Sequence, residues 1–146
     1  MASTSQLETL IDMARRETDD SAKRLGAALK AVSDAEQKLQ MLIGYRDDYG
    51  SRFDAAQQGG ITPMAYRNFQ AFMEKLDTAV KGQEEMVRHA QKRSELEKAK
   101  WQEAERKRMS YSTLRDREAA RQQKIEAKRD QKAMDEHAAR QAFYKR

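Results

Sequence analysis

The fold is decided by the stretch Gln57-Gln58-Gly59-Gly60-Ile61-Thr62-Pro63, the one strong turn signal in a chain of 146 residues. Glycine can adopt the left-handed backbone conformation that ends many helices, so Gly59 or Gly60 can close the segment before it. Thr62 is suited to cap the segment that follows, because Pro63 then occupies the first helical position, where its missing N–H costs nothing. The stretch therefore predicts a short turn between two helices.

On both sides of this turn, seam positions recur at alternating steps of four and three residues, and most of them are apolar. Before the turn they are Leu7, Ile11, Ala14, Thr18, Ser21, Leu25, Ala28, Val32, Ala35, Leu39, Leu42, Arg46, Tyr49 and Phe53. After it they are Tyr66, Phe69, Met73, Leu76, Val80, Gln83, Val87, Ala90, Ser94, Glu97, Trp101, Ala104, Arg108 and Tyr111. A 3.5-residue repeat of this length is typical of a coiled coil, and a short connection makes the two helices antiparallel. We therefore predict an all-α fold, a long antiparallel two-helix coiled-coil hairpin.

The expected helices run from about residue 5 to 54 and from 63 to 114, with the turn at 55–62. A capping box of Ser5 and Glu8 marks the start of the first helix. With Phe53 opposite Tyr66, the first helix has no residues left to pair beyond about residue 112. Residues 1–114 thus form the hairpin, and residues 115–146 overhang as a basic C-terminal extension, helical or frayed.

The largest apolar side chains of both stripes gather near the turn, at Leu39, Leu42, Tyr49, Phe53, Tyr66, Phe69, Met73 and Leu76. A fully buried large apolar side chain contributes roughly 1.5–3 kcal/mol. We therefore expect stability to concentrate at the turn end and the open end to fray.

The composition supports a thin helical molecule, with 38% hydrophobic and 36% charged residues and a single proline. Globular domains usually hold about 45–50% apolar and about 25% charged residues. The chain has no cysteine, which excludes disulfides and thiolate metal sites. No stretch approaches the ~20 apolar residues that span a bilayer, and the first residues lack the pattern of a signal peptide. We expect no direct membrane insertion.

Charge is unevenly distributed along the chain. Residues 1–60 hold 8 Lys/Arg against 10 Asp/Glu, whereas residues 61–146 hold 21 against 14. The basic run is densest in the extension, at Arg115, Arg117, Arg121, Lys124, Lys128, Arg129 and Lys132. Such asymmetry indicates an acidic partner, either nucleic acid or an acidic protein surface. Acidic residues interrupt the run, and the hydrophobic repeat precedes it rather than follows it as in a leucine zipper, so a specific nucleic-acid reader is the less favoured alternative.

Catalysis finds no support in the sequence. The two histidines are far apart, and in Asp135-Glu136-His137 adjacent residues of a helix point in different directions. Gly59-Gly60 is too short to be a phosphate-binding loop. We expect no catalytic residue, no cofactor and no metal.

One apolar patch exceeds what the seam requires. Tyr45, Phe72 and Ala79 lie beside the stripes, and the pairing of the helices places them next to Leu42, Tyr49, Leu76. A wide apolar stripe can simply thicken a core, which is the alternative reading. Because two helices can bury only a narrow seam, the surplus of aromatic residues indicates a docking site for another protein.

Several fragments stand in a specific order and spacing along the chain. They are Leu7-Glu8-Thr9-Leu10, Lys38-Leu39-Gln40-Met41-Leu42-Ile43 with Tyr45 and Tyr49, Gly60-Ile61, Asn68-Phe69-Gln70-Ala71-Phe72 with Leu76, Leu114-Arg115-Asp116-Arg117 and Asp130-Gln131-Lys132-Ala133-Met134-Asp135-Glu136. Together they resemble the FliJ family of the bacterial flagellar type III export apparatus. The resemblance covers essentially the whole length. It implies a cytoplasmic coiled coil, peripheral to the inner membrane, that is similar to the central stalk of rotary ATPases.

The resemblance also implies partners. They are the hexameric export ATPase, whose ring assembly and activity such proteins promote, the cytoplasmic domain of the export gate, and export chaperones that are recycled. The family's gate-binding surface corresponds here to Leu42, Tyr45, Tyr49, Phe72, Leu76, Ala79 and Gln83. By similarity to the stalk, the open end is expected to bind the ATPase through Arg115, Arg117, Arg121, Lys124, Lys128 and Lys132. Two positions depart from the family pattern: Lys38 replaces a glutamine, and Gln83 replaces a histidine that can occur there.

Overall fold

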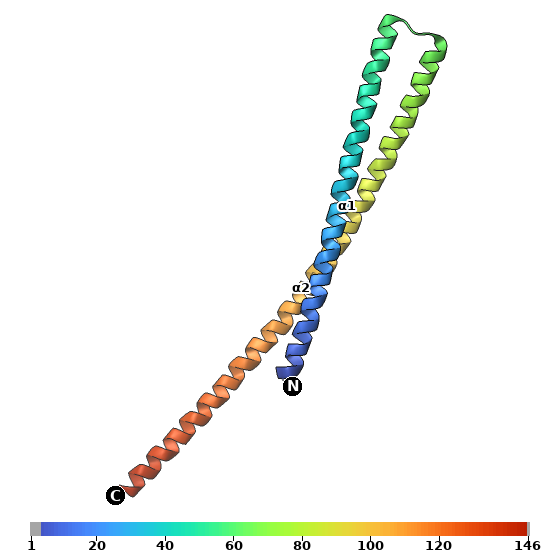
Figure 1. Cartoon of the computed structure of the whole chain (residues 1–146). Helices are drawn as coiled ribbons and strands as arrows, with labels where there is room; N and C mark the ends of the chain where they lie inside the picture. The colour runs from blue at the N-terminus through green and yellow to red at the C-terminus, as the bar shows by residue number, and fades with distance from the viewer. Residues whose placement is uncertain (1–3, 146) are drawn as a thin grey trace. The chain divides into compact units, whose positions relative to one another are not determined.

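The computed structural model describes residues 4–145, which form two α-helices and no strand. Helix α1 (Thr4–Gly59) has 56 residues, and helix α2 (Pro63–Tyr144) has 82 (Figure 1). The predicted all-α fold, with two long helices packed against each other, is confirmed. Neither helix, within the described residues, is long and apolar enough to cross a membrane.

The turn between the helices has the predicted capping geometry. Gly60 has a φ of 83°, and its N–H donates to the carbonyl of Gln57 at 3.3 Å. The Thr62 hydroxyl accepts a hydrogen bond from the N–H of Ala65 at 3.1 Å, and Pro63 is the first helical residue. The turn is nevertheless shorter than the predicted 55–62, because α1 continues to Gly59. Only Gly60 requires the left-handed conformation, and the alanines and glutamines before it favour helix.

The outer helix boundaries also differ from those expected. Helix α1 begins at Thr4, one residue before the predicted cap, which is within the usual variation of helix ends. Helix α2 runs without interruption through residue 114 and ends at Tyr144, so the extension is helical over residues 115–144. Its treatment as a domain of its own stays a prediction.

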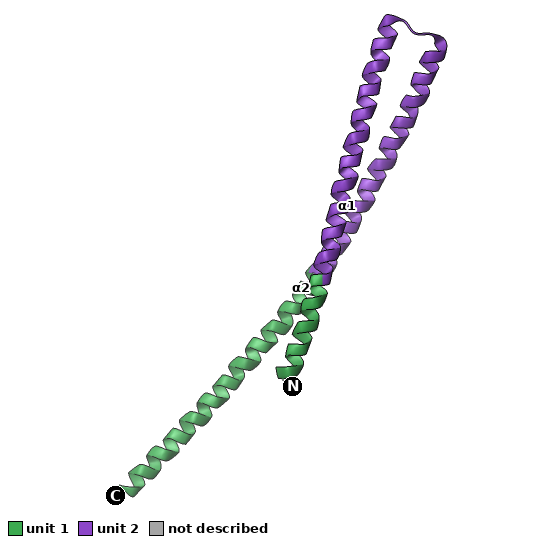
Figure 2. Ribbon diagram, viewed as in Figure 1, with its two compact units in different colours: residues 1–19, 102–146 green, residues 20–101 purple. Residues whose placement is uncertain are grey.

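Two compact units divide the chain, and each contains a segment of both helices (Figure 2). One unit comprises residues 1–19 and 102–146, and the other comprises residues 20–101. In the second unit the segments on either side of the turn lie side by side and antiparallel, as shown by the contact of Phe53 with Tyr66, whose ring centroids are 5.4 Å apart. In the first unit, an ion pair of 3.9 Å joins Glu8 of α1 to Arg115 of α2.

The seam predicted from the heptad repeat forms the core of both units. Every position of the two stripes is buried or half-buried, except Tyr66, which is 37% exposed. In the first unit the most enclosed side chain is Ile11, at 1% exposure. In the second unit it is Ser21, also at 1%, followed by Val80 at 2%.

Burial along the seam does not peak at the turn, where the greatest stability is expected. Tyr49, Phe53, Phe69 and Met73 are only half-buried, whereas the open end carries the fully buried Leu7 and Ile11. Small seam residues such as Ala14, Ser21, Ala28 and Ala104 let two helices approach closely, so that a single neighbour can enclose a side chain. Aromatic rings are too large for that, and a pair of helices leaves part of each ring uncovered.

Candidate functional site

Near the turn, both helices contribute to a cluster of aromatic rings that pack at tilted angles. Tyr49 lies between Phe69 and Phe72, with ring centroids 5.1 and 4.5 Å away. Phe53 contacts Phe69 at 5.1 Å and Tyr66 at 5.4 Å. Tilted contacts of this kind are worth about 0.5–1.5 kcal/mol each beyond their buried area, so the cluster holds its side chains in defined positions.

A groove beside this cluster is lined by four of the seven residues of the predicted docking patch, Tyr45, Tyr49, Phe72 and Leu76. Tyr45 is 56% exposed and Phe72 is 45% exposed, and both border this groove of about 450 Å³. The groove is lined by Tyr45, Asp48, Tyr49, Arg52, Phe72 and Leu76. Leu42 is half-buried beside it, and Ala79 is exposed. This part of the unit therefore offers an apolar hollow with one acidic and one basic residue at its edge.

Gln83 is the member of the predicted patch that the structure places elsewhere. It is buried, with 8% exposure, and its Nε2 donates to the carbonyl oxygen of Ala35 across the seam at 3.0 Å. Its side chain is thus engaged within the core and does not extend the exposed patch. The heptad repeat already indicated this burial, because Gln83 is one of the seam positions.

Five of the six basic residues expected to bind the ATPase share one face of α2. At 100° per residue, Arg117, Arg121, Lys124, Lys128 and Lys132 lie within an arc of about 80°. We call them the basic stripe. The acidic residues between positions 117 and 132 are Glu118, Glu126 and Asp130, and they lie outside that arc. This face of α2 is therefore positively charged between residues 117 and 132.

Arg115 and Arg121 differ from the other basic residues by their ion pairs. Arg115 lies on the side opposite the stripe and pairs with Glu8 at 3.9 Å and Asp116 at 3.5 Å. Arg121 donates two hydrogen bonds to Glu118, at 3.1 and 2.7 Å. These bonds, with a further one from Gln122, lower the pKa of the Glu118 carboxyl below its ordinary value. Arg115 is thus a structural contact of the first unit rather than part of the stripe.

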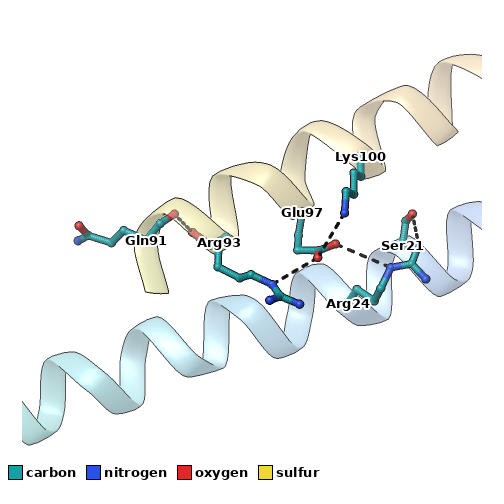
Figure 3. Close-up of polar contacts among 7 residues, drawn as sticks. Ser21, Arg24, Gln91, Arg93, Glu97 and Lys100 are labelled. Atoms are coloured by element: carbon teal, nitrogen blue, oxygen red, sulfur yellow. Dashed lines mark hydrogen bonds and ion pairs between the residues drawn. The ribbon is translucent and has the colours of Figure 1, made fainter. Parts of the chain in front are cut away.

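A buried carboxylate in the second unit forms a polar cluster that sequence reasoning missed. Glu97 occupies a seam position, is 4% exposed, and is approached by Arg93 at 3.6 Å, Arg24 at 3.8 Å and Lys100 at 4.0 Å (Figure 3). Arg24 also donates to the Ser21 hydroxyl at 2.9 Å. Three basic residues around one carboxylate give the cluster a net positive charge. The sequence did contain a signal for this cluster: Glu97 is an acidic residue in the seam, with Arg93 four residues before it and Lys100 three residues after it.

No group of three or more His, Cys, Asp or Glu side chains within residues 4–145 is placed to hold a metal ion. The surfaces with distinct chemistry among the described residues are the aromatic groove, the basic stripe and the Glu97 cluster.

Comparison with known proteins decides the family. The sequence model of the family described as "Flagellar FliJ protein" matches residues 3–146. The chain belongs to the FliJ family. It is 34% identical over 145 residues to the flagellar FliJ protein of Salmonella typhi and 30% identical over 145 residues to that of Escherichia coli K12, in each case covering 99% of both chains.

Membership of the FliJ family identifies the chain as a component of the flagellar export apparatus. The prediction of a protein of flagellum biogenesis and protein export is confirmed. The match over the whole length includes both the aromatic groove and the basic stripe.

Proposed function

We propose that this FliJ-family chain is a stalk-like coiled coil that binds the hexameric export ATPase, promotes its ring assembly and activity, and couples it to the export gate. The cytoplasmic domain of the gate docks on the aromatic groove, and the ATPase binds the basic stripe. A role in recycling export chaperones accompanies this coupling. The protein then works in the cytoplasm, peripheral to the inner membrane.

The observation that carries the proposal is the exposure of large aromatic side chains in an ordered cluster. Tyr45 and Phe72 retain about half of their surface although their neighbours are half-buried. Binding energy at protein interfaces concentrates in a few aromatic and arginine side chains around a hollow. Tyr45, Phe72 and Arg52 supply such residues at the groove.

Replacing Phe72 with serine tests the gate contact. Binding of the cytoplasmic gate domain, measured by isothermal titration calorimetry, is expected to weaken at least tenfold, because a central anchor is lost. Helicity is expected to stay nearly unchanged, since Phe72 lies beside the seam. The matched control is Leu29→Ser, which removes an apolar side chain of 54% exposure from another face of the same unit and leaves binding intact. If the Phe72→Ser variant binds the gate domain as tightly as the wild type does, the gate does not dock on the aromatic groove.

The ATPase contact is tested on the basic stripe. The chain can raise ATPase activity only by binding some states of the ring better than others, which requires a specific surface. Charge reversal at Arg117, Lys124 and Lys128 is expected to abolish stimulation, as is deletion of residues 115–146. The control is charge reversal at Arg129 and Arg140, which lie on another face of α2. This control variant is expected to stimulate the ATPase normally. If the two sets of variants behave alike, net charge rather than the stripe acts on the ATPase.

A nucleic-acid-binding coiled coil is the alternative, and the single-sided stripe is the observation that favours it. We expect any affinity for DNA to be weak, independent of sequence and steeply lowered by salt, as phosphate contacts are. Fluorescence anisotropy with two unrelated duplexes at two salt concentrations measures this. Tight, sequence-selective binding that is lost with residues 115–146, together with no effect on the ATPase, would favour the alternative.

A further inference from the structure

The positions beside the seam in residues 20–101 form two flanks of opposite charge. In the heptad repeat abcdefg, positions a and d form the seam and position g directly precedes the next a. In an antiparallel pair, the g positions of the two helices face each other along one side of the seam. On this side, which we call the basic flank, they are Arg24, Ala31, Lys38, Tyr45, Arg52, Ala65, Phe72, Ala79, Met86, Arg93 and Lys100. The row holds five basic residues and no acidic one.

The other side of the seam has different chemistry. Its row consists of Ala22, Leu29, Glu36, Ile43, Gly50, Gln70, Asp77, Glu84, Gln91 and Lys98, with three acidic residues and one basic residue. The groove found there is lined by Ser33, Glu36, Gln37, Leu39, Gln40 and Val87 and contains no aromatic side chain. The contrast shows that the charge of the basic flank is not a general property of the unit.

Two grooves lie along the basic flank. The aromatic groove described above holds Tyr45, Arg52 and Phe72 from this row. The second, of about 380 Å³, is lined by Arg24, Ala27, Ala28, Ala31, Arg93 and Glu97. Met86, which is 58% exposed, belongs to the same row. Apolar hollows therefore alternate with basic side chains along one side of the unit.

The second groove ends at the Glu97 cluster. There one buried carboxylate is shared by Arg24, Arg93 and Lys100, whose side chains are 48%, 75% and 58% exposed. Their charge exceeds that of Glu97 by two, and the ammonium of Lys100 and the guanidinium of Arg93 are the most exposed of the three groups. Asp48 is the acidic side chain lining the aromatic groove, where Arg52 is also present.

We propose that the basic flank binds an acidic amphipathic helix of a partner protein. The helix lies along both grooves over about 28 residues, or roughly 42 Å, and forms a three-helix bundle with the unit. Its apolar side chains occupy the hollow between Tyr45 and Phe72 and that beside Ala31, and its carboxylates face Lys38, Arg52 and the Glu97 cluster. This inference deepens the proposed docking of the export gate and rests on it for the identity of the partner.

Charge disfavours this chain's own extension as the occupant. Residues 115–146 carry 10 basic residues against 6 acidic ones, so they are repelled by the basic flank at close range. A partner with acidic residues beside an apolar stripe matches both properties of the flank, and such complementarity sets partner choice and orientation in helix bundles.

The experiment uses the full-length chain and a labelled probe peptide of about 28 residues, with leucine at seam positions and glutamate beside them. Glutamates on both sides of its stripe keep the peptide from pairing with itself. Fluorescence anisotropy is expected to show binding of this peptide, weakened about tenfold or more by Lys38→Glu with Arg52→Glu and by added salt. The matched control, Lys98→Glu with Lys92→Glu, makes the same change in charge away from the flank and is expected to bind normally.

A second peptide with lysine in place of every glutamate is expected not to bind. Equal binding of both peptides, binding of neither, or equal losses in the flank variant and the control variant would each overturn the proposal. So would a wild-type dimer in sedimentation equilibrium that the Lys38/Arg52 variant loses, because the occupant would then be a second copy of the chain.

Competition with the cytoplasmic gate domain separates this inference from the proposed function. If the acidic peptide binds through the flank but the gate domain does not displace it, the flank chemistry stands and the gate assignment fails. If the gate domain binds the wild type and the Lys38→Glu, Arg52→Glu variant equally well, the gate assignment stands and the present inference fails.

Discussion

Replacing Glu97 with leucine is expected to stabilise the protein. The side chain is 6% exposed, and its Oε2 has no hydrogen-bond partner within the described residues. The nearest basic groups lie 3.6–4.0 Å away, beyond the range of a good hydrogen bond. Those basic side chains are themselves at least 48% exposed, so removing the carboxylate leaves no buried, uncompensated charge behind.

The magnitude follows from three contributions. A buried leucine contributes roughly 1.5–3 kcal/mol relative to an exposed one. Three partly exposed ion pairs are lost, each worth about 0.2–1 kcal/mol, and they offset most of that gain. The desolvation cost of a buried carboxylate, several kcal/mol when its hydrogen bonds are incomplete, is removed as well. Replacing buried ion pairs by apolar residues of similar size has been neutral or stabilising by about 1–4 kcal/mol, and we expect an increase within that range in the free energy of unfolding. Each kcal/mol corresponds to a rise in Tm of roughly 2–8 °C.

Urea unfolding followed by circular dichroism measures this free energy. The neighbouring exposed residue provides a control, since Glu95→Leu is expected to change stability by less than about 0.5 kcal/mol. Glu97→Gln keeps the size and polarity of the side chain and is expected to lack the stabilisation that leucine brings. A loss of 1 kcal/mol or more in Glu97→Leu would refute the reasoning, because the ion pairs would then outweigh the cost of burial.

Three further outcomes are expected. Ile11→Ala should lower the free energy of unfolding by about 2–5 kcal/mol, and Leu39→Ala, at a half-buried position, should cost clearly less in the same urea titration. Thr62→Ala removes the hydroxyl that caps α2 and should cost about 0.5–2 kcal/mol, whereas Thr62→Ser should cost much less. The pKa values of Glu105 and Glu118 are lowered below 4.5 by hydrogen bonds from Arg108 and Arg121. Their stabilisation is therefore present above pH 4.5 and is lost as the pH falls through the lowered values, so helicity measured by circular dichroism should decrease there; a constant signal would contradict it.

Sequence reasoning predicted the fold because its two signals are local and redundant. Gly60 and Thr62 identify the turn through backbone rules that hold in any context, and the structure has both features. The heptad repeat then determines which face of each helix is buried, and all but one of its positions are buried or half-buried. Helix ends were less well predicted: the turn was expected from residue 55, although the alanines and glutamines before Gly59 favour helix and α1 continues through them.

The candidate surfaces were predicted less completely, since they depend on distances between helices. Tyr45 and Phe72 are exposed, and their role in docking stays a prediction. Gln83 was included on resemblance, and its amide donates across the seam to the carbonyl oxygen of Ala35. The basic stripe required knowledge that α2 is unbroken, because only then do residues 117–132 keep one angular position. The Glu97 cluster depends on the reach of Arg24 from the other helix, which no repeat reveals.

The distribution of burial connects the folding of the chain to its docking. Two helices can enclose Ile11, Ser21 or Ala28, because a small or medium side chain fits into the gap that one neighbour covers. The same two helices cannot enclose Tyr45 and Phe72, which keep about half of their surface. Those rings therefore add little to the stability of the isolated chain and retain apolar area that a third helix can bury. In the proposed docking a partner helix buries this apolar area, and the basic side chains beside the rings favour an acidic partner.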